Sequence, residues 1–425
     1  MRSLTGILAV LLLSCFTGAP ATGTESHRLL ILKKGQRVAI VGDSITEQKL
    51  YSKFIELYLT ACLPDLDLHC IQLGWGGETA PGFAARMNND LLPWKPDVVT
   101  TCYGMNDGGY RAYEEGIGKR YYLAMADIVA RIKKTGATVV VGGPGIVDSK
   151  YFQGGGDKPK VYNDNLKHLS EQAKKVADEE GFPHADVFGA MMAAMEKAKP
   201  ALGEAYDVGG RDGVHPGPNG HLVMAYAFLK GMGIDGNIGT ITVDVRGAAS
   251  ATDGHKVIGS EGGKVEIESS RYPFCFSGDD KSPAGTRSML PYVPFNDDLN
   301  RFLLVVKNLD SAKAKVTWGA ASKSFTKGEL EKGINLAAEF AESPFAESFR
   351  KIEGLIAAKQ GFETGMIKSV INQFPRLVDS MGKDKAVEAS VEALRKQLFD
   401  TQEKLDAAVR TARLPVRHTI AIAAE

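Results

Sequence analysis

The sequence predicts an α/β protein: a parallel sheet covered by helices on both faces, then a small β-rich unit and a helical C-terminal segment. Between residues 36 and 232, short apolar runs alternate with longer amphipathic segments, the pattern of parallel strands joined by helices. Several of the apolar runs stop at a glycine or a Gly/Pro turn, as buried strands that end sharply do. The pattern changes near Gly233, after which short alternating runs and then a charged helical stretch follow.

The first predicted unit covers residues 28–233. Its strands are expected at 37–41, 69–73, 97–103, 137–141 and 184–187. Its helices are expected at 48–62, 81–92, 113–135, 160–180 and 219–230. In sheets of this kind the ligand crevice lies at the carboxyl ends of the strands, so we expect a functional site at that edge.

The second predicted unit, residues 236–330, is β-rich. Its strands are expected at 240–245, 264–268, 302–306 and 315–318. The first two alternate apolar and polar residues, as half-exposed antiparallel strands do, and this favours a small β-sandwich. Residues 331–425 are predicted to be helical, with a break at Pro375 and a solvated, charged face.

The composition places limits on the function. A chain of 425 residues is long for one domain, and 44% apolar with 24% charged residues is typical of a globular protein. The formal net charge is +0, which gives no support for a polyanionic partner. We therefore expect no nucleic-acid partner.

The N-terminus has the features of an export signal. A positive charge at Arg2 precedes the apolar run Leu4–Leu13, and Ala19–Ala21 offers an A-x-A cleavage site, which predicts a signal peptide over 1–21. Alternatively, the residues before Cys15 resemble a bacterial lipoprotein box, with a signal over 1–14 and Cys15 lipidated. Both routes predict an extracytoplasmic protein that is secreted, periplasmic or lipid-anchored. Membrane contact is expected only through that anchor.

Ser44 lies at a sharp turn from the first strand into a helix. Such a position exposes the hydroxyl and puts the backbone N–H near a helix N-terminus, where negative charge is favoured. This is a suitable geometry for a nucleophile. The alternative is that Asp43 and Ser44 only cap the helix, as such residues commonly do.

Four short pieces, taken in order, resemble the blocks of the GDSL/SGNH hydrolase family. They are the segments 37–47, 74–79, 104–107 and 212–216, and the letters of the family name fall on Ser44, Gly77, Asn106 and His215. The resemblance covers roughly residues 36–232. It implies a three-layer α/β/α, flavodoxin-like domain and a serine esterase that needs neither metal nor cofactor. The motif G-x-S-x-G is absent from the chain, which argues against the α/β-hydrolase elbow.

The resemblance implies that Ser44 is the nucleophile and His215 the general base. The three-residue spacing lets the Asp212 carboxylate reach Nδ1 of His215, leaving Nε2 free to face Ser44. The alternative for this segment is a capped loop–helix junction with Asp212 bonded to backbone. Asp207 is a weaker rival for the acid role, and His221 is interpreted as structural.

The oxyanion donors implied by the resemblance are the backbone N–H groups of Ser44 and Gly77 and the side-chain amide of Asn106. Glycine lets the backbone approach a substrate, and asparagine donates without titrating. A plain tight turn at Gly77 and a helix cap at Asn106 are compatible with these roles. Asp43 and Asp107 are interpreted as supporting residues, with Asp107 holding Asn106 in place.

Three other observations bear on the chemistry. In an oxidising compartment Cys62 and Cys70 are the nearest pair for a disulfide, whereas Cys102 reads as a buried small hydrophobe. Trp75 is the tryptophan best placed to stack on a sugar. The chain has no C-x-x-C pair that would support a structural zinc site.

The function predicted from these features is hydrolysis of carboxylic esters through an acyl-enzyme on Ser44. An exported enzyme with an added β-unit resembles most closely the family members that remove acetyl groups from extracellular polysaccharide. The first alternative is a lysophospholipase, another lipid esterase or a thioesterase of the same family. The second alternative is a catalytically idle glycan-binding protein. Against it stands the complete set of family residues, which includes Asp212 and His215.

Overall fold

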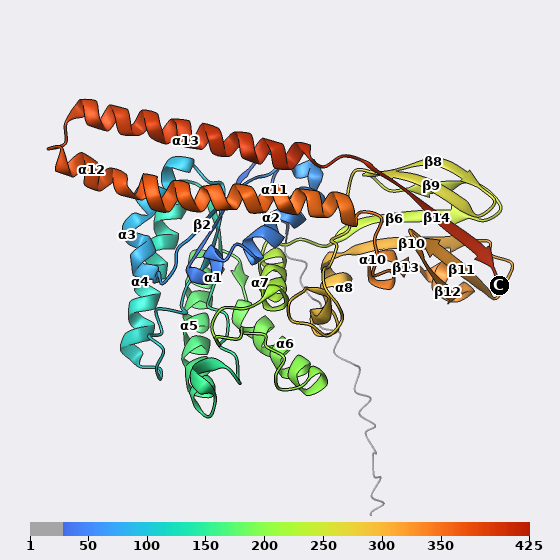
Figure 1. Ribbon diagram of the computed structural model, residues 1–425, viewed down its shortest axis with the longest axis horizontal. Coiled ribbons are helices and arrows are strands. Elements are labelled where there is room, and N and C mark those ends of the chain that lie inside the picture. The colour runs from blue at the N-terminus through green and yellow to red at the C-terminus, as the bar shows by residue number, and fades with distance from the viewer. Residues whose placement is uncertain (1–28) are drawn as a thin grey trace, which may run out of the picture.

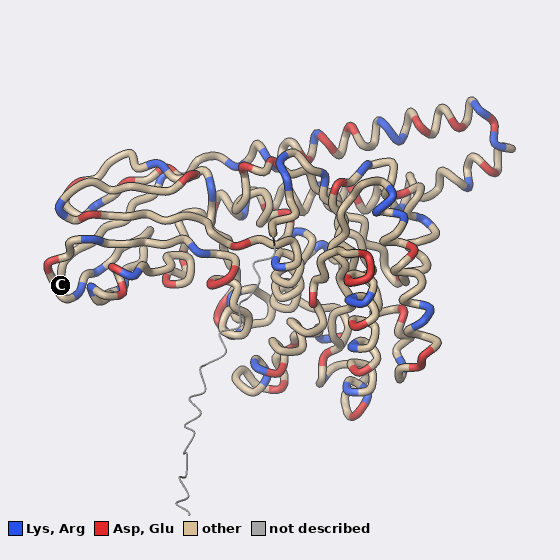
Figure 2. Tube along the Cα trace, turned by 180° about the vertical axis from the view of Figure 1, so that it is seen from behind, with Lys and Arg blue, Asp and Glu red and all other residues tan. Residues whose placement is uncertain are grey.

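The computed structural model describes residues 29–425. The expected signal peptide, its cleavage site and Cys15 lie outside the described residues. Within the described part, no helix is both long and apolar enough to cross a membrane. Figure 2 shows basic and acidic residues interspersed along the chain.

The first unit, here called the α/β domain, is built on a parallel five-stranded sheet, as predicted. Its strands are β1 (Arg37–Gly42), β2 (His69–Gly74), β3 (Val98–Cys102), β4 (Thr138–Gly142) and β5 (His184–Ala185). The order β2-β1-β3-β4-β5 is the flavodoxin-like order of doubly wound sheets. The connection therefore reverses between β2 and β3, and the site is expected at that point, beyond the end of β1.

Helices cover both faces of this sheet (Figure 1). They are α1 (Ser44–Glu47), α2 (Tyr51–Ala61), α3 (Ala80–Asp90), α4 (Glu115–Lys133), α5 (Lys158–Glu180), α6 (Val187–Leu202) and α7 (Pro218–Gly231). Alternate residues of β1 point to opposite faces: Val38 and Ile40 pack in the core with α2, α6 and α7, and Ala39 and Val41 in the core with α3 and α4. Helix α6 was not predicted from the sequence.

The β-rich unit is a sandwich of two sheets. One sheet has the order β13-β10-β6-β7, from β6 (Asn237–Asp244), β7 (Ala249–Ala251), β10 (Arg301–Lys307) and β13 (Ile334–Asn335). The other has the order β12-β11-β14-β9-β8, from β8 (His255–Glu261), β9 (Lys264–Ser269), β11 (Lys313–Trp318), β12 (Ala321–Thr326) and β14 (Val416–Ala424). Short helices α8 (Phe295–Leu299), α9 (Lys327–Lys332) and α10 (Leu336–Glu339) accompany the strands.

The sandwich core is aromatic. Phe302 of the first sheet lies 5.9 Å from the Trp318 ring and 6.1 Å from the His418 ring of the second. One expectation for these strands needs correction. Although β6 alternates apolar and polar residues, it pairs in parallel with β10 and antiparallel only with the short β7. The alternation of apolar and polar residues indicates that one face of the strand is buried. It does not indicate whether the neighbouring strand is parallel or antiparallel.

The C-terminal segment forms a helical hairpin, here called the helical arm (residues 346–411). It comprises α11 (Ala346–Gly365), the π-helical turn η5 (Met366–Val370), the short η6 (Ile371–Gln373), α12 (Phe374–Ser380) and α13 (Lys385–Thr411). Figure 1 shows α11 and α13 side by side along the α/β domain, with the hairpin tip extending past it.

The chain does not stay helical to residue 425, which corrects the expectation from the sequence. After the arm, β14 returns to the sandwich and pairs antiparallel with β9 on one side and β11 on the other. Its partners lie far away in the sequence, so the charged helix before it dominates the local pattern. Pro375 lies in the first turn of α12, where proline is tolerated.

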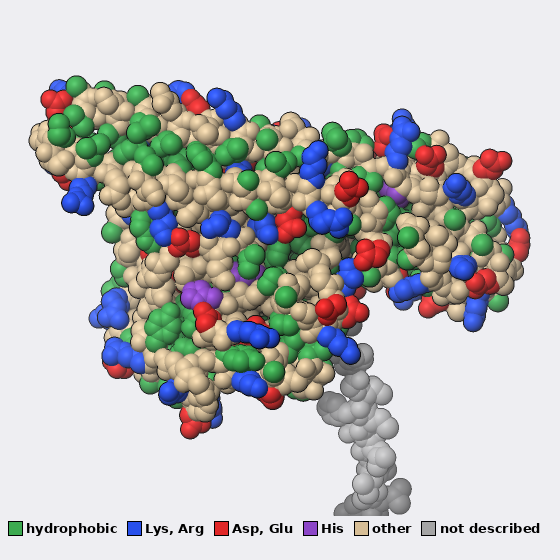
Figure 3. All heavy atoms as spheres, in the orientation of Figure 1, with side chains coloured by type: hydrophobic (Ala, Val, Ile, Leu, Met, Phe, Trp, Pro, Cys, Tyr) green, Lys and Arg blue, Asp and Glu red, His purple; other side chains and the backbone are tan. Residues whose placement is uncertain are grey.

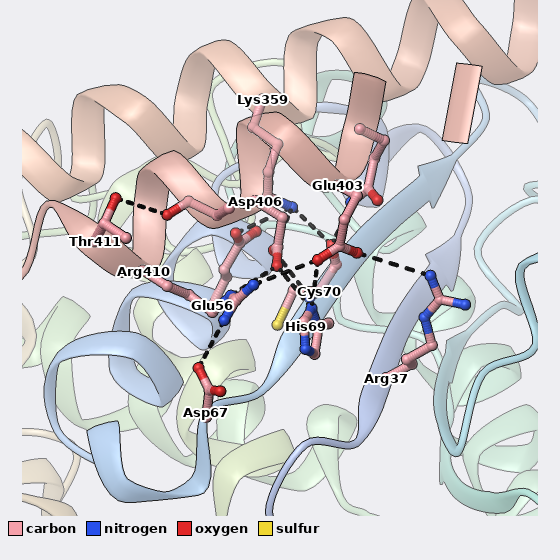
Figure 4. Close-up of polar contacts among 12 residues, drawn as sticks. Arg37, Glu56, Asp67, His69, Cys70, Lys359, Glu403, Asp406, Arg410 and Thr411 are labelled. Carbon is pink, nitrogen blue, oxygen red and sulfur yellow. Dashed lines mark hydrogen bonds and ion pairs between the residues drawn. The ribbon is translucent and has the colours of Figure 1, made fainter. Parts of the chain in front are cut away.

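Buried charged side chains hold the helical arm against the α/β domain (Figure 4). The Lys359 side chain of α11 is fully buried, and its Nζ lies 2.7 Å from Glu363 Oε1, 3.0 Å from Glu56 Oε1 and 3.7 Å from Asp406 Oδ1. It also donates a hydrogen bond of 2.7 Å to the Cys70 carbonyl of β2. Burial alone would lower the pKa of Lys359, but these carboxylates outweigh it and raise the pKa.

The cysteines of the described region are free thiols, which corrects the expected Cys62–Cys70 pair. Cys62 is the C-cap residue of α2, whereas Cys70 lies within β2, opposite Val38 of β1. Burial raises the pKa of both thiols. Cys102 is a buried residue of β3, as expected.

Candidate active site

Two glycines let helix α1 sit directly on the strand ends. A Cβ on Gly42 would lie 2.1 Å from Thr46 Oγ1 and 2.7 Å from the Cys102 carbonyl oxygen. A Cβ on Gly74 would lie 2.3 Å from the backbone nitrogen of Glu47. A side chain at either position would push α1 away, so these glycines fix the place of Ser44.

The sheet register brings the predicted site segments to one edge. Gly42 at the end of β1 pairs with Gly74 of β2 on one side and with Cys102 of β3 on the other. Ser44, Gly77 and Asn106 follow these three strand ends within four residues. They therefore share the carboxyl edge of the sheet, where the sequence predicted that they would meet.

Ser44, His215 and Asp212 form a continuous chain of hydrogen bonds. His215 Nε2 lies 2.8 Å from Ser44 Oγ, and His215 Nδ1 lies 2.6 Å from Asp212 Oδ2. The other carboxylate oxygen, Asp212 Oδ1, accepts the backbone N–H groups of Val214 at 2.9 Å and His215 at 2.8 Å. Asp212 thus bonds to the backbone and to the His215 ring at the same time. The loop therefore has both the backbone capping and the contact with histidine that the sequence allowed.

The electrostatics keep Asp212 ionised. Partial burial would raise the pKa of its carboxyl, but the N–H groups of His215 and Val214 and the His215 ring outweigh burial and lower the pKa. The side chains of His215 and Asp212 are 36% and 56% exposed, so the site is open to solvent. Figure 3 shows histidine side chains at the surface of the α/β domain, below the helical arm.

Asp207 and His221, the other candidate acid and a nearby histidine, make contacts elsewhere. Asp207 Oδ1 lies 3.5 Å from Arg211 Nε, and no described contact joins it to His215. His221 is buried, where its Nδ1 accepts the Tyr51 N–H at 3.1 Å and its Nε2 lies 3.1 Å from Gln48 Oε1. Burial lowers the pKa of His221 to about 3, so this ring is neutral and structural.

The candidate oxyanion donors are arranged as a cradle. Gly77 has φ +73° in a turn closed by the Glu78 N–H on the Trp75 carbonyl at 3.1 Å, here called the oxyanion turn (residues 75–78). Neither the Gly77 N–H nor the Ser44 N–H has an acceptor within the described chain. Both groups are therefore available to a substrate oxygen.

The Asn106 side chain is held on both sides. Its Nδ2 donates to the Glu78 carbonyl at 2.9 Å, which leaves the second N–H of the amide for a substrate. Its Oδ1 accepts the Tyr110 hydroxyl at 2.8 Å. Tyr110 has φ +57°, an outlier for an aromatic residue and a kind of strain that clusters at functional sites. Sequence analysis missed Tyr110, because nothing local marks its backbone or its partner.

The two supporting aspartates act on backbone. Asp107 accepts the Gly104 N–H at 3.0 Å and the Ala80 N–H at 2.9 Å, so it ties the Asn106 loop to the start of α3. Asp43 caps α1 by accepting the Ile45 N–H at 3.0 Å. Burial raises the pKa of Asp43 to about 7 and that of Asp107 to about 6. Neither carboxylate bonds to Ser44 or to Asn106 directly.

A group with metal-ligand spacing lies at the opposite end of the sheet, around the start of β2. His69, Glu403 and Asp406 place a ring nitrogen and two carboxylate oxygens within 4.8 Å of one another. Arg410 already donates to these carboxylates, with Nε 3.0 Å from Asp406 Oδ2 and Nη2 3.3 Å from Glu403 Oε1 (Figure 4). The guanidinium takes the place that a cation would need, so we read the group as an ion-pair network.

Trp75 is half-buried beside the cradle. The guanidinium carbon of Arg86 lies 4.9 Å from its ring centre, and Lys368 Nζ lies 5.0 Å from it. Arg86 is itself held by Glu78 at 2.6 and 2.8 Å. The contacts of the Trp75 ring are thus cationic, and they brace the oxyanion turn.

Comparison with known proteins agrees with this geometry. Residues 40–223 match the GDSL-like lipase/acylhydrolase family. The chain is 24% identical to an acetylxylan esterase of Geobacillus stearothermophilus over 216 residues, which cover 47% of this chain and 95% of that protein. It also resembles the structure of a gut microbial diltiazem-metabolizing enzyme, with a TM-score of 0.70, 21% identity, and coverage of 93% of this chain and 99% of that chain. That second likeness shows the fold alone. Residues 40–223 therefore resemble the GDSL/SGNH family of ester hydrolases in sequence.

Proposed function

We propose that this protein is a serine esterase that removes short acyl groups, above all acetyl, from carbohydrate. The observation that carries the proposal is the hydrogen-bond chain from Asp212 through His215 to Ser44. A serine hydroxyl needs such a base to become a nucleophile at neutral pH. The free N–H groups of Ser44 and Gly77 supply the second requirement, donors for the oxyanion.

The proposed reaction follows from the geometry. Ser44 Oγ attacks the ester carbonyl carbon while His215 Nε2 takes the hydroxyl proton, and Asp212 stabilises the imidazolium. The oxyanion is bound by the N–H groups of Ser44 and Gly77 and the Asn106 amide. The ester C–O bond then breaks, and His215 returns the proton to the leaving alcohol. Water, deprotonated by His215, attacks the acyl-enzyme and releases the carboxylic acid and Ser44.

Two observations favour a short acyl group on a bulky, polar alcohol. The partly exposed His215 and the exposed Gly77 leave the site open, which suits an ester carried on a sugar chain. A lipid esterase would need an apolar channel beside Ser44. A cavity of about 2730 Å³ is instead lined mainly by residues of α5, α6 and α7. Its lining does not include Ser44, Asp212 or His215. The similarity to an acetylxylan esterase supports the same choice.

The test is hydrolysis of p-nitrophenyl acetate, butyrate and octanoate and of acetylated xylan, by the wild type and by Ser44→Ala. We expect acetate release from both acetyl substrates, lost in the variant. Preference for octanoate would favour the lipid esterase. Rates equal to those of Ser44→Ala on every substrate would contradict the esterase and favour a glycan-binding role.

We also propose that the enzyme acts outside the cytoplasm, on the strength of the N-terminal signal. Fractionation and the mass of the mature N-terminus test this. Cleavage after Ala21 would indicate secretion, whereas loss of membrane association in Cys15→Ala would indicate a lipid anchor. An intact Met1 in the cytoplasmic fraction would contradict export.

A further inference from the structure

A lysine of the helical arm reaches the oxyanion turn. Lys368 lies in the π-helical turn η5, and its Nζ is 2.6 Å from Glu47 Oε1. The other carboxylate oxygen, Glu47 Oε2, accepts the backbone N–H of Gly76. Glu47 is the last residue of α1, the helix that begins with Ser44. One carboxylate therefore links the arm, the nucleophile helix and the turn that presents Gly77.

The conformation of the oxyanion turn decides whether Gly77 can act as a donor. The value of φ +73° at Gly77 is that of the third residue of a type II turn. Type I and type II turns differ by rotation of the central peptide, here the peptide that carries the Gly77 N–H. With glycine at both central positions, neither conformer is excluded by a side chain. A flip to type I would replace the donor by the Gly76 carbonyl.

Contacts outside the turn must therefore select the productive conformer. Glu47 holds the Gly76 N–H at one end, and Arg86 holds the Glu78 carboxylate at the other. Without a cation, the Glu47 carboxylate would be free to turn toward solvent. Lys368 keeps it in place, and both side chains are largely covered, with 28% and 25% of their surface exposed. Such partly buried, charge-assisted contacts are stronger than exposed ion pairs.

The arm is rigid enough to deliver this lysine. Lys359, nine residues earlier on the same helical run, is buried and paired with Glu363 and Glu56. The Thr364 hydroxyl accepts a hydrogen bond of 3.0 Å from Gln72 of β2. The π-helical turn follows, and its first two residues, Met366 and Ile367, are buried. Single π-turns inside helices are frequently functional.

We propose that Lys368, acting through Glu47, is a positioning residue that holds the oxyanion turn in its donor conformation. The helical arm is in this respect a working part of the active site. The inference rests on the proposed esterase function for its catalytic consequence, but the conformational effect on the turn does not depend on the substrate.

The experiment compares Lys368→Met, Lys368→Arg and the wild type. Lys351→Met is the matched control, because Lys351 is an exposed lysine of α11 with no ion pair within the described chain. Two quantities are measured: kcat and KM for p-nitrophenyl acetate, and hydrogen–deuterium exchange of a peptide covering residues 73–79. A melting temperature close to that of the wild type shows that each variant is folded.

We expect Lys368→Met to lower kcat by roughly tenfold, a fraction of the loss for a deleted oxyanion donor, with a much smaller change in KM. Exchange in residues 73–79 should become faster in the same variant. Lys368→Arg keeps the charge and should recover most of both properties, and Lys351→Met should match the wild type. A merely structural lysine would lower the melting temperature without separating kcat from KM.

The two proposals fail in different ways. Unchanged exchange in Lys368→Met would overturn the positioning role, whatever the catalytic rates. Faster exchange with an unchanged kcat would also overturn it, since the turn would then not limit catalysis. If the wild type shows no Ser44-dependent turnover, the esterase function is contradicted, and the exchange result alone decides whether Lys368 holds the turn.

Discussion

Tyr110 donates its hydroxyl hydrogen to Asn106 Oδ1 over 2.8 Å, from a backbone with φ +57°. The bond fixes which end of the Asn106 amide faces the substrate, because the amide could otherwise rotate and present its oxygen. The Tyr110 ring is held in turn by the Tyr162 ring, with centroids 5.2 Å apart. An unfavourable backbone conformation is thus maintained where it orients a donor.

Removing that hydroxyl should weaken catalysis without unfolding the protein. We expect Tyr110→Phe to lower kcat for p-nitrophenyl acetate by roughly twofold to tenfold, the value of one hydrogen bond. The ring stack is kept, so the melting temperature should stay near that of the wild type. Tyr113→Phe is the control, since Tyr113 stacks on His168 away from Asn106. A rate equal to that of the control would show that Asn106 needs no help from Tyr110.

The two candidate acids can be separated by matched substitutions. Asp212→Asn should lower kcat by about 10⁴-fold, because an amide favours the wrong His215 tautomer and cannot stabilise the imidazolium. Asp207→Asn loses only the pairing with Arg211 and should retain most activity. Steady-state kinetics on p-nitrophenyl acetate measure both. A larger loss in Asp207→Asn than in Asp212→Asn would reverse the assignment.

The buried Lys359 should be essential for stability. Lys359→Met leaves the carboxylates of Glu363 and Glu56 buried without their cation, whereas Asp406 keeps its contact with Arg410. Breaking a buried ion pair in this way costs about 3–5 kcal/mol, and urea unfolding measures it as a lower midpoint. The exposed Lys351→Met serves again as the control. A change as small as that of the control would mean that the carboxylates are neutral in the native protein.

The sandwich should lose stability in acid through His418. Burial, and then the neighbouring His255, lower the pKa of His418 to about 4 from the ordinary value of 6.5. The unfolded chain binds a proton below about pH 6.5, whereas the folded protein does so only near pH 4. The contribution of His418 to the free energy of unfolding is therefore fully present above about pH 6.5. It decreases by about 3 kcal/mol as the pH falls toward about 4.

Urea midpoints across that pH window, for the wild type and His418→Gln, check the prediction. The wild type should show the steeper decrease, because glutamine does not titrate. The hydrogen bond from Trp318 Nε1 to His418 Nδ1, 3.2 Å long, places an indole fluorophore beside the histidine. Parallel curves for the two proteins would assign the acid sensitivity to other groups.

The sequence was sufficient where a signal is local. The strands that end at Gly42 and Gly74 and the turn that joins Asp212 to His215 are short segments whose residue types determine their shape. The sheet then brings these segments together by a general rule of parallel sheets, which is why their meeting at one edge could be predicted. The predicted helix over 48–62 differs only in detail, because Lys49, at φ +58°, separates α1 from α2.

The remainder depends on contacts between distant residues. Helix α6 is rich in alanine and methionine and contains Pro200, so its period is weak and its faces are set by the sheet below. Strand β14 is separated from β9 by the whole arm. The contact of Lys368 with Glu47 joins residues 321 positions apart, and neither residue type signals it. Such pairs are decided by tertiary packing.

The placement of β14 also determines when the molecule can be completed. Its residues, 416–424, form the middle strand of a five-stranded sheet, so β9 and β11 cannot be joined until β14 has been synthesised. The α/β domain has all of its own strands before that moment. The arm precedes β14 in the sequence, so its C-terminal end is fixed to the sandwich only when β14 enters the sheet. The contact between Lys368 and Glu47 therefore joins α1 to a segment that is synthesised after the α/β domain is complete.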